Sequence, residues 1–115
     1  MSESVAEIDD ALLKSMTEDI VDEVHPEEVI LFGSHARGSE NSRSDVDFLV
    51  VVPDDETTRH SRRRITGRLY RRLASFPVPK DILVFTREEV ERWRHVSGHV
   101  ISTGLNEGKR LYVRS

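Results

Sequence analysis

The chain has 115 residues, of which 37% are hydrophobic and 33% are charged. This length predicts a single domain over residues 1–115, and the composition is that of a folded chain. Because there is no cysteine, disulfides, thiolate zinc sites, iron–sulfur clusters and cysteine nucleophiles are excluded. The longest apolar run, Phe48 to Val52, is too short to cross a membrane, and the acidic start is unlike a secretory signal. We therefore expect a soluble cytoplasmic protein.

The net charge of -4 conceals a strong segregation of charge along the chain. Residues 1–28 contain ten acidic residues and only one basic residue, Lys14, whereas residues 57–76 contain seven arginines and no acid. This layout favours a protein partner over duplex nucleic acid, because duplex binders are normally basic overall. Both segments are candidate docking faces, although such a run of charge is usually the solvent-exposed face of a helix.

Two periodicities divide the chain into alternating helices and strands. Apolar residues at steps of three and four indicate helices, and short β-branched runs bounded by glycine or proline indicate strands. In chain order, the predicted elements are a helix over 5–24, strands over 28–32 and 46–52, a helix over 57–76, a strand over 81–85, a helix containing Val90 and Trp93, a helix over 97–106 and an edge strand over 111–113. They predict an α/β domain with one small mixed sheet flanked by helices.

Capping patterns support several of these helix ends. Ser4 with Glu7, and Thr86 with Glu89, have the spacing of a capping box at a helix start. Gly108 is a favoured residue just after the end of a helix. We therefore expect helices to begin near residues 5 and 87 and the last helix to stop at Gly108.

The segment that follows the first predicted strand has the features of a phosphate-binding turn. Gly33 allows a sharp turn, and Ser34 can open a short helix whose hydroxyl and free amides suit an anion. An isolated Gly-Ser pair would more often be only a turn, but its spacing to nearby acids favours a nucleoside triphosphate site. We expect Arg37 to contact the phosphates or to neutralise the acids, and Ser44 to cap or orient the acid pair.

Three aspartates are the candidate catalytic and metal-binding residues. Asp45 and Asp47 are two residues apart at a strand start, so both carboxylates point to the same side, where a bound Mg²⁺ would offset their repulsion. Asp81 begins the next predicted strand and would join them if the two strands are neighbours. Such a site could bind two Mg²⁺ ions, with Asp81 on the second ion and able to take the acceptor's proton. This chemistry predicts nucleotidyl transfer.

At these residues the sequence resembles the minimal nucleotidyltransferases, the MntA-like antitoxins of the DNA polymerase beta superfamily. Their signature is Gly-Ser, ten residues and Asp-x-Asp, followed by a later acid. Here Gly33-Ser34, residues 35–44 and Asp45-Val46-Asp47 match it without a gap, and Asp81 is the later acid. The order of elements agrees over nearly the whole chain. The resemblance implies a polymerase-beta-like fold, two Mg²⁺ ions and ATP as the substrate.

The resemblance also implies a protein partner. Larger enzymes of the superfamily have a second domain that holds the acceptor, and 115 residues leave no room for one. The usual partner of the minimal enzymes is a HEPN-domain protein. The transferase acts there as an antitoxin, transferring AMP from ATP to a tyrosine of the HEPN ribonuclease. We therefore expect a hetero-oligomer, with no membrane association and no direct binding to duplex nucleic acid.

Three other readings of the sequence remain open. The acceptor could be a small hydroxylated molecule of the aminoglycoside type, or the chain could be a non-catalytic antitoxin that occludes its partner. A DxD glycosyltransferase is a remote third reading, because those folds need far longer chains. His95 and His99 have a spacing that would suit zinc on a helix, but without an evident third ligand they are expected to be structural or solvent-facing. Trp93 is expected in the core or at an interface.

Overall fold

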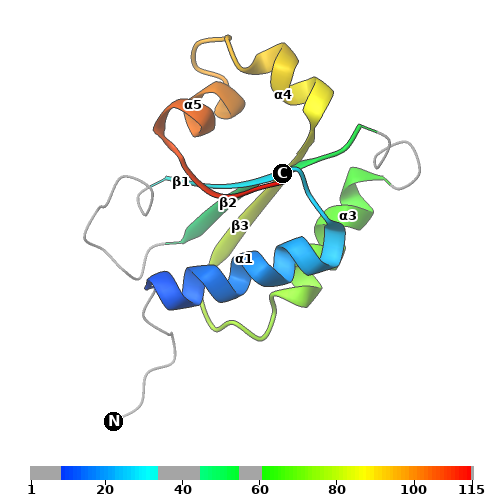
Figure 1. Cartoon of the computed structure of the whole chain (residues 1–115), viewed down its shortest axis with the longest axis vertical. Coiled ribbons are helices and arrows are strands. Elements are labelled where there is room, and N and C mark those ends of the chain that lie inside the picture. The colour runs from blue at the N-terminus through cyan, green and yellow to red at the C-terminus, as the bar shows by residue number, and fades with distance from the viewer. Residues whose placement is uncertain (1–8, 34–44, 55–60, 115) are drawn as a thin grey trace.

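The computed structural model describes residues 9–33, 45–54 and 61–114, which form four helices and a four-stranded sheet (Figure 1). The elements in chain order are α1 (Asp10–Val24), β1 (Glu28–Phe32), β2 (Val46–Val52), α3 (Arg62–Arg72), β3 (Lys80–Thr86), α4 (Arg87–Trp93), α5 (Val100–Glu107) and β4 (Lys109–Val113). In these ranges no helix combines the length and the apolar character that a membrane span requires. The predicted α/β fold is confirmed.

The sheet is mixed, with strand order β3-β2-β1-β4. β1 runs antiparallel to both β2 and β4, whereas β2 and β3 are parallel. Parallel neighbours need a crossover connection, and α3 lies within the one that joins β2 to β3. The predicted edge strand is present as β4, and it is longer than the three residues expected.

Helices cover both faces of the sheet (Figure 1). α1 and α3 pack on one face, where Met16, Ile20 and Leu69 meet Phe48 and other β2 side chains in the larger core cluster. α4 and α5 cover the other face around a smaller cluster of Val51, Val90 and Ile101. Because side chains alternate along a strand, neighbouring residues of β2 pack into the two clusters on opposite faces of the sheet.

The start of α1 differs from the expected start near residue 5. In the described part of the chain this helix begins at Asp10, and the Asp9 carboxylate accepts a hydrogen bond from the Leu12 amide at 2.9 Å. Asp9 therefore caps the helix in the usual way for a short acidic side chain. The predicted Ser4–Glu7 capping box lies outside the described residues.

Three other helix ends were predicted at the wrong residue. α3 begins at Arg62, after its N-cap Ser61, instead of at residue 57. α3 ends at Arg72 instead of residue 76, because the chain tightens into turns before Pro77 and a residue that precedes proline is pushed out of helical geometry. α5 begins at Val100 instead of residue 97, because Gly98 has a positive φ of 86°. His99 is its N-cap.

The other capping predictions are confirmed. Thr86 and Glu89 form a complete capping box: the Thr86 hydroxyl accepts from the Glu89 amide at 3.1 Å, and the Glu89 carboxylate accepts from the Thr86 amide at 2.9 Å. α5 ends at Gly108. An added Cβ at Gly108 would lie 2.9 Å from the Leu31 carbonyl oxygen, so glycine is required there by close packing against β1.

The acidic helix α1 and the arginine-rich helix α3 pair with each other. Arg68 donates to the Glu23 carboxylate at 3.1 Å, and Arg72 lies 3.1 Å from Glu23, 2.9 Å from Asp22 and 3.4 Å from Asp19. Burial raises the pKa of Glu23, but the hydrogen bonds from the two arginines outweigh it and leave that pKa below its usual value. These residues therefore join the two helices to each other, and the expectation that the helices are docking faces stays a prediction.

At the start of β1, Glu28 is held between two arginines. Arg87 and Arg110 lie 2.6 Å and 2.8 Å from its two carboxylate oxygens, and only 9% of the Glu28 side chain is exposed. Burial raises the pKa of Glu28, yet hydrogen bonds from both guanidinium groups outweigh burial and hold the pKa below its usual value. This end of β1 is opposite to the end that leads into Gly33.

Arg87→Met should lower the free energy of unfolding by about 2–3 kcal/mol, because it leaves the buried Glu28 charge with one partner fewer. Urea denaturation at neutral pH measures the change. The matched control is Arg92→Met on the same helix, whose exposed pair with Glu88 is 3.6 Å long and should contribute less than about 0.5 kcal/mol. Equal losses from the two substitutions would contradict the role assigned to Glu28.

The same carboxylates predict how stability depends on pH. Glu23, Glu28 and Glu89 are all desolvated, which raises the pKa, but their hydrogen bonds outweigh this and lower the pKa below the ordinary 4.5. A carboxylate whose pKa is lower in the folded state stabilises above its unfolded pKa and loses this contribution as the pH falls through the folded value. We expect urea midpoints to hold down to about pH 5 and to fall below about pH 4.5. A midpoint that rises from pH 5 to pH 3 would contradict this.

Candidate active site

Asp47 and Asp81 lie side by side on neighbouring strands. They are register partners in the parallel pair β2–β3 and occupy the second position of each strand. Register partners point to the same face of a sheet, with strands about 4.8 Å apart. Since Phe48 and Ile82 belong to the core under α1 and α3, both aspartates point to the face that carries α4 and α5. Asp45 is exposed and immediately precedes β2.

Gly33 brings the end of β1 against the Asp47 carboxylate. It follows Phe32, the register partner of Asp47, and has a positive φ of 82°. A Cβ at this position would lie 2.4 Å from Asp47 Oδ2, which is too close for any side chain. Gly33 thus has two separate reasons to be glycine: its backbone conformation and its contact with this carboxylate.

The other predicted phosphate-site residues, Ser34, Arg37 and Ser44, lie outside the described residues. They follow Gly33 and precede Asp45 in the sequence. Their roles stay predictions.

The donor chemistry of the aspartates fits Mg²⁺. Asp45, Asp47 and Asp81 offer only hard carboxylate oxygens, which are the ligands that Mg²⁺ prefers. In residues 9–33, 45–54 and 61–114, no three histidine, aspartate or glutamate side chains are already gathered closely enough to hold a metal ion. The fit therefore rests on the adjacent Asp47 and Asp81 and on the chemistry of their oxygens, with Asp45 two residues away on the same chain segment.

Tyr70 is a residue of this region that sequence analysis did not single out. Its hydroxyl accepts a hydrogen bond of 2.9 Å from the amide of Ile82, the residue after Asp81. The tyrosine therefore ties α3 to the outer edge of β3 next to the candidate metal ligand. A half-exposed tyrosine in a helix gives no sequence signal for such a contact.

Lys80 directly precedes Asp81 but points away from it. Its register partner is Val46, which faces the α1 and α3 core, and its Nζ donates to the Phe76 carbonyl at 3.2 Å. Burial lowers the pKa of Lys80. The lysine therefore fixes the turn between α3 and β3, and we assign it no role toward phosphate.

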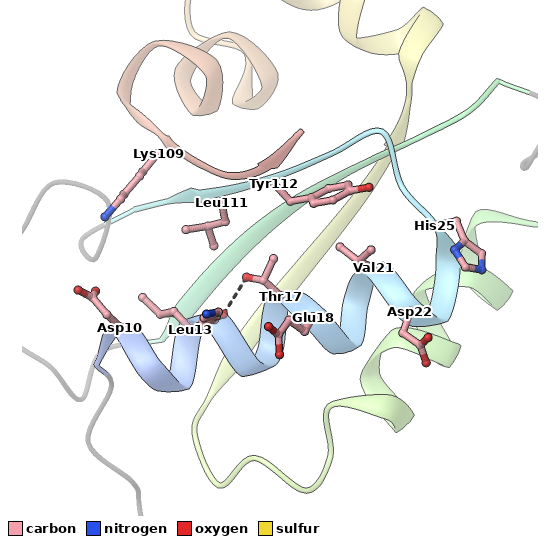
Figure 2. A pocket seen from close by; sticks show the side chains of 11 residues that line it. Asp10, Leu13, Thr17, Glu18, Val21, Asp22, His25, Lys109, Leu111 and Tyr112 are labelled. Atoms are coloured by element: carbon pink, nitrogen blue, oxygen red, sulfur yellow. Dashed lines mark hydrogen bonds between the residues drawn. The ribbon is translucent and has the colours of Figure 1, made fainter. Parts of the chain in front are cut away.

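A groove of about 600 Å³ lies between α1 and β4, away from the aspartates (Figure 2). Its apolar lining includes Leu13 and Val21 of α1 and Leu111 and Tyr112 of β4, which pack against the larger core. Leu111 is the extra residue of a bulge in β4, where the register with β1 shifts. Since the groove is on the sheet face opposite to the two aspartates, we do not assign it to the nucleotide.

The two histidines with zinc-like spacing do not share a helix. His95 lies in the turn after α4, and His99 caps α5 by accepting a hydrogen bond from the Ile101 amide at 3.1 Å. The His99 ring also stacks on Trp93, with ring centres 4.7 Å apart. The prediction of a structural role is confirmed for His99, and Trp93 is 36% exposed at this contact.

Solved structures with the same fold include a presumed nucleotidyltransferase from Sulfolobus solfataricus, at 23% identity and a TM-score of 0.61, covering 90% of this chain and 79% of that one. A toxin–antitoxin structure with AMP-PNP is 18% identical with a TM-score of 0.53, and the match covers 89% of this chain and 74% of that one. A mutant of the toxin–antitoxin MntA-HpeT is also 18% identical with a TM-score of 0.53, and the match covers 95% of this chain and 76% of that one. No curated protein matches the sequence.

A mixed sheet with two carboxylates at the starts of parallel strands, beside a glycine turn, places this chain among the α/β nucleotidyltransferase folds. The family model of the nucleotidyltransferase domain matches residues 13–109. The chain belongs to this family. The resemblance to a minimal nucleotidyltransferase of this superfamily is confirmed.

Proposed function

We propose that this protein transfers AMP from ATP to a tyrosine hydroxyl of a HEPN-domain partner, and so acts as the antitoxin of a two-protein pair in the cytoplasm. The observation that carries the proposal is the register of Asp47 with Asp81 on the parallel strands β2 and β3. Support also comes from membership of the nucleotidyltransferase family and from the shared fold with toxin–antitoxin structures, one of them with AMP-PNP.

One group of residues would bind the phosphates of ATP, and a second group would hold the metal ions. The turn at Gly33 and Ser34 would bind the triphosphate through backbone amides and a hydroxyl. Arg37 and Ser44 would complete this side of the site. Asp45, Asp47 and Asp81 would hold Mg²⁺, which when bound neutralises charge on the phosphates and lowers the pKa of an attacking hydroxyl.

The reaction is an in-line displacement at the α-phosphorus. The acceptor oxygen forms a bond to this phosphorus, the bond to the oxygen that bridges to the β-phosphate breaks, and pyrophosphate leaves with the bonding electron pair. The hydroxyl proton would pass to the Asp81 carboxylate, which is exposed at the sheet end and able to reach an incoming acceptor. Catalysis in such a site depends mainly on positioning and on fixed charge.

The proposal is tested by incubating the protein, Mg²⁺ and ATP labelled at the α-phosphate with the product of the gene adjacent to its own, which the proposal expects to be a HEPN-domain protein. Label should appear on a tyrosine of the partner and be lost with Asp45→Ala and with Asp47→Ala. Asp54→Asn is the control, because Asp54 lies at the opposite end of β2 and Asn keeps the oxygen that accepts from the Glu88 amide. Label transfer that survives both alanine substitutions would refute the assigned roles. Full neutralisation of the partner by Asp45→Ala would favour occlusion.

A further inference from the structure

The outer face of α3 carries arginines that have no ion pair within residues 9–33, 45–54 and 61–114. At 100° per residue, Gly67 lies on the side of the helix opposite to the buried Ile65 and Leu69. Arg63 and Arg71 lie one turn before and one turn after Gly67, and Arg64 is beside them. We call Arg63, Arg64, Gly67 and Arg71 the arginine face.

The remaining arginines of α3 have partners within the molecule, in contrast to this face. Arg62 pairs with Glu89 at 2.5 Å, and Arg68 and Arg72 pair with acids of α1. Among the residues that the structure describes, no ion pair includes the three arginines of the face, although all three are exposed. α3 contains no acidic residue to offset their mutual repulsion.

Gly67 is not explained by packing or by its backbone. Glycine is among the least favourable residues in a helix interior. Among the described residues, an added Cβ at Gly67 would meet only Arg71 Nη1 at 3.5 Å, which is an ordinary contact, and its φ is not in the positive region. Alanine would therefore fit this position and would stabilise the helix. The same face thus combines a destabilising glycine with unpaired like charges, and nothing inside the described chain compensates for either.

We propose that the arginine face docks an acidic helix of a partner protein. Arg64 and Arg71 are seven residues apart, so they are separated by about 10.5 Å along the helix axis. Carboxylates seven residues apart on a second helix have the same separation. The missing side chain at Gly67 lets the backbone of that helix approach closely between the two arginines. The net charge of -4 disfavours a nucleic acid as the occupant.

The arginine face lies on the other side of the molecule from the two aspartates. α3 packs on the sheet face that it shares with α1, whereas Asp47 and Asp81 point to the face that carries α4 and α5. The docking is therefore proposed independently of the candidate active site and does not rest on the proposed function.

The test is an NMR titration of the ¹⁵N-labelled full chain, without ATP, at low ionic strength. The probe is a synthetic alanine-based helical peptide of about 20 residues with glutamates seven residues apart. The shifted amides should lie in α3. Arg64→Gln with Arg71→Gln should weaken binding about fivefold to tenfold. The matched control, Lys14→Gln with Arg92→Gln, changes the net charge equally at exposed positions elsewhere and should change affinity less than twofold.

Gly67→Ala separates docking from stability. It should raise the urea midpoint and at the same time weaken peptide binding, since it removes the close approach. The proposal is overturned if Gly67→Ala binds as tightly as the wild type, if the control pair weakens binding as much as the arginine pair, or if the shifts lie outside α3. Tighter binding of an oligouridylate to the same face would also overturn it. Because no ATP is present, these results do not depend on whether AMP transfer occurs.

Discussion

Asp81→Asn should slow AMP transfer by about 10²–10³-fold, because loss of one carboxylate removes several kcal/mol of transition-state stabilisation at a metal-assisted centre. The fold should be retained, since Asp81 is exposed and its backbone pairing in β3 is unchanged. The effect should fall on kcat more than on KM, because a ligand and proton acceptor acts mainly in the transition state.

Steady-state measurement of pyrophosphate release with the acceptor protein gives both constants. Asp54→Asn provides the matched change at the far end of β2 and should leave kcat within about twofold. Its oxygen still accepts from the Glu88 amide. If Asp81→Asn left kcat unchanged, Asp81 would not belong to the site, and only Asp45 and Asp47 would remain as its acids.

Gly33→Ala should abolish most of the transfer activity and also lower stability. The positive φ of 82° costs an alanine about 1–2 kcal/mol, and its Cβ would meet Asp47 Oδ2 at 2.4 Å and displace this carboxylate. Activity and urea denaturation are measured on the same preparation.

Gly98→Ala separates these two effects. Gly98 has a similar φ of 86°, but an added Cβ there meets no atom within 4 Å in the part of the chain that the structure describes. It should therefore lose a similar amount of stability and keep its activity. Equal activity of the Gly33→Ala and Gly98→Ala proteins would contradict the importance of the contact between Gly33 and Asp47.

The elements of this fold were predictable because their signals are local. Short apolar, β-branched runs predicted the four strands, and the Thr86–Glu89 spacing predicted the start of α4. The ends of α3 and α5 were misplaced because a periodic pattern continues past the point where the backbone leaves helical geometry. Gly98 ends one such pattern and the approach to Pro77 ends another.

The arrangement of the elements depends on contacts that no local pattern encodes. The sequence predicted that Asp81 could join Asp47 only if their strands were neighbours, and their one-to-one register became visible only in the structure. The pairing of Arg68 and Arg72 with α1 joins residues about fifty positions apart, so a charge run interpreted as an exposed face is in part an internal contact. The contact of Gly33 with Asp47 likewise depends on the antiparallel pairing of β1 with β2.

The position of the label on ATP tests the central claim most directly. The acceptor protein is incubated in parallel with ATP labelled at the α-phosphate and with ATP labelled at the γ-phosphate, using the wild-type chain and Asp47→Asn. Transfer of AMP predicts that only the α-label reaches the acceptor, that the γ-label leaves as pyrophosphate, and that Asp47→Asn gives neither product. Labelling of the acceptor from the γ-phosphate, or α-labelling that is undiminished in Asp47→Asn, would contradict nucleotidyl transfer by these carboxylates.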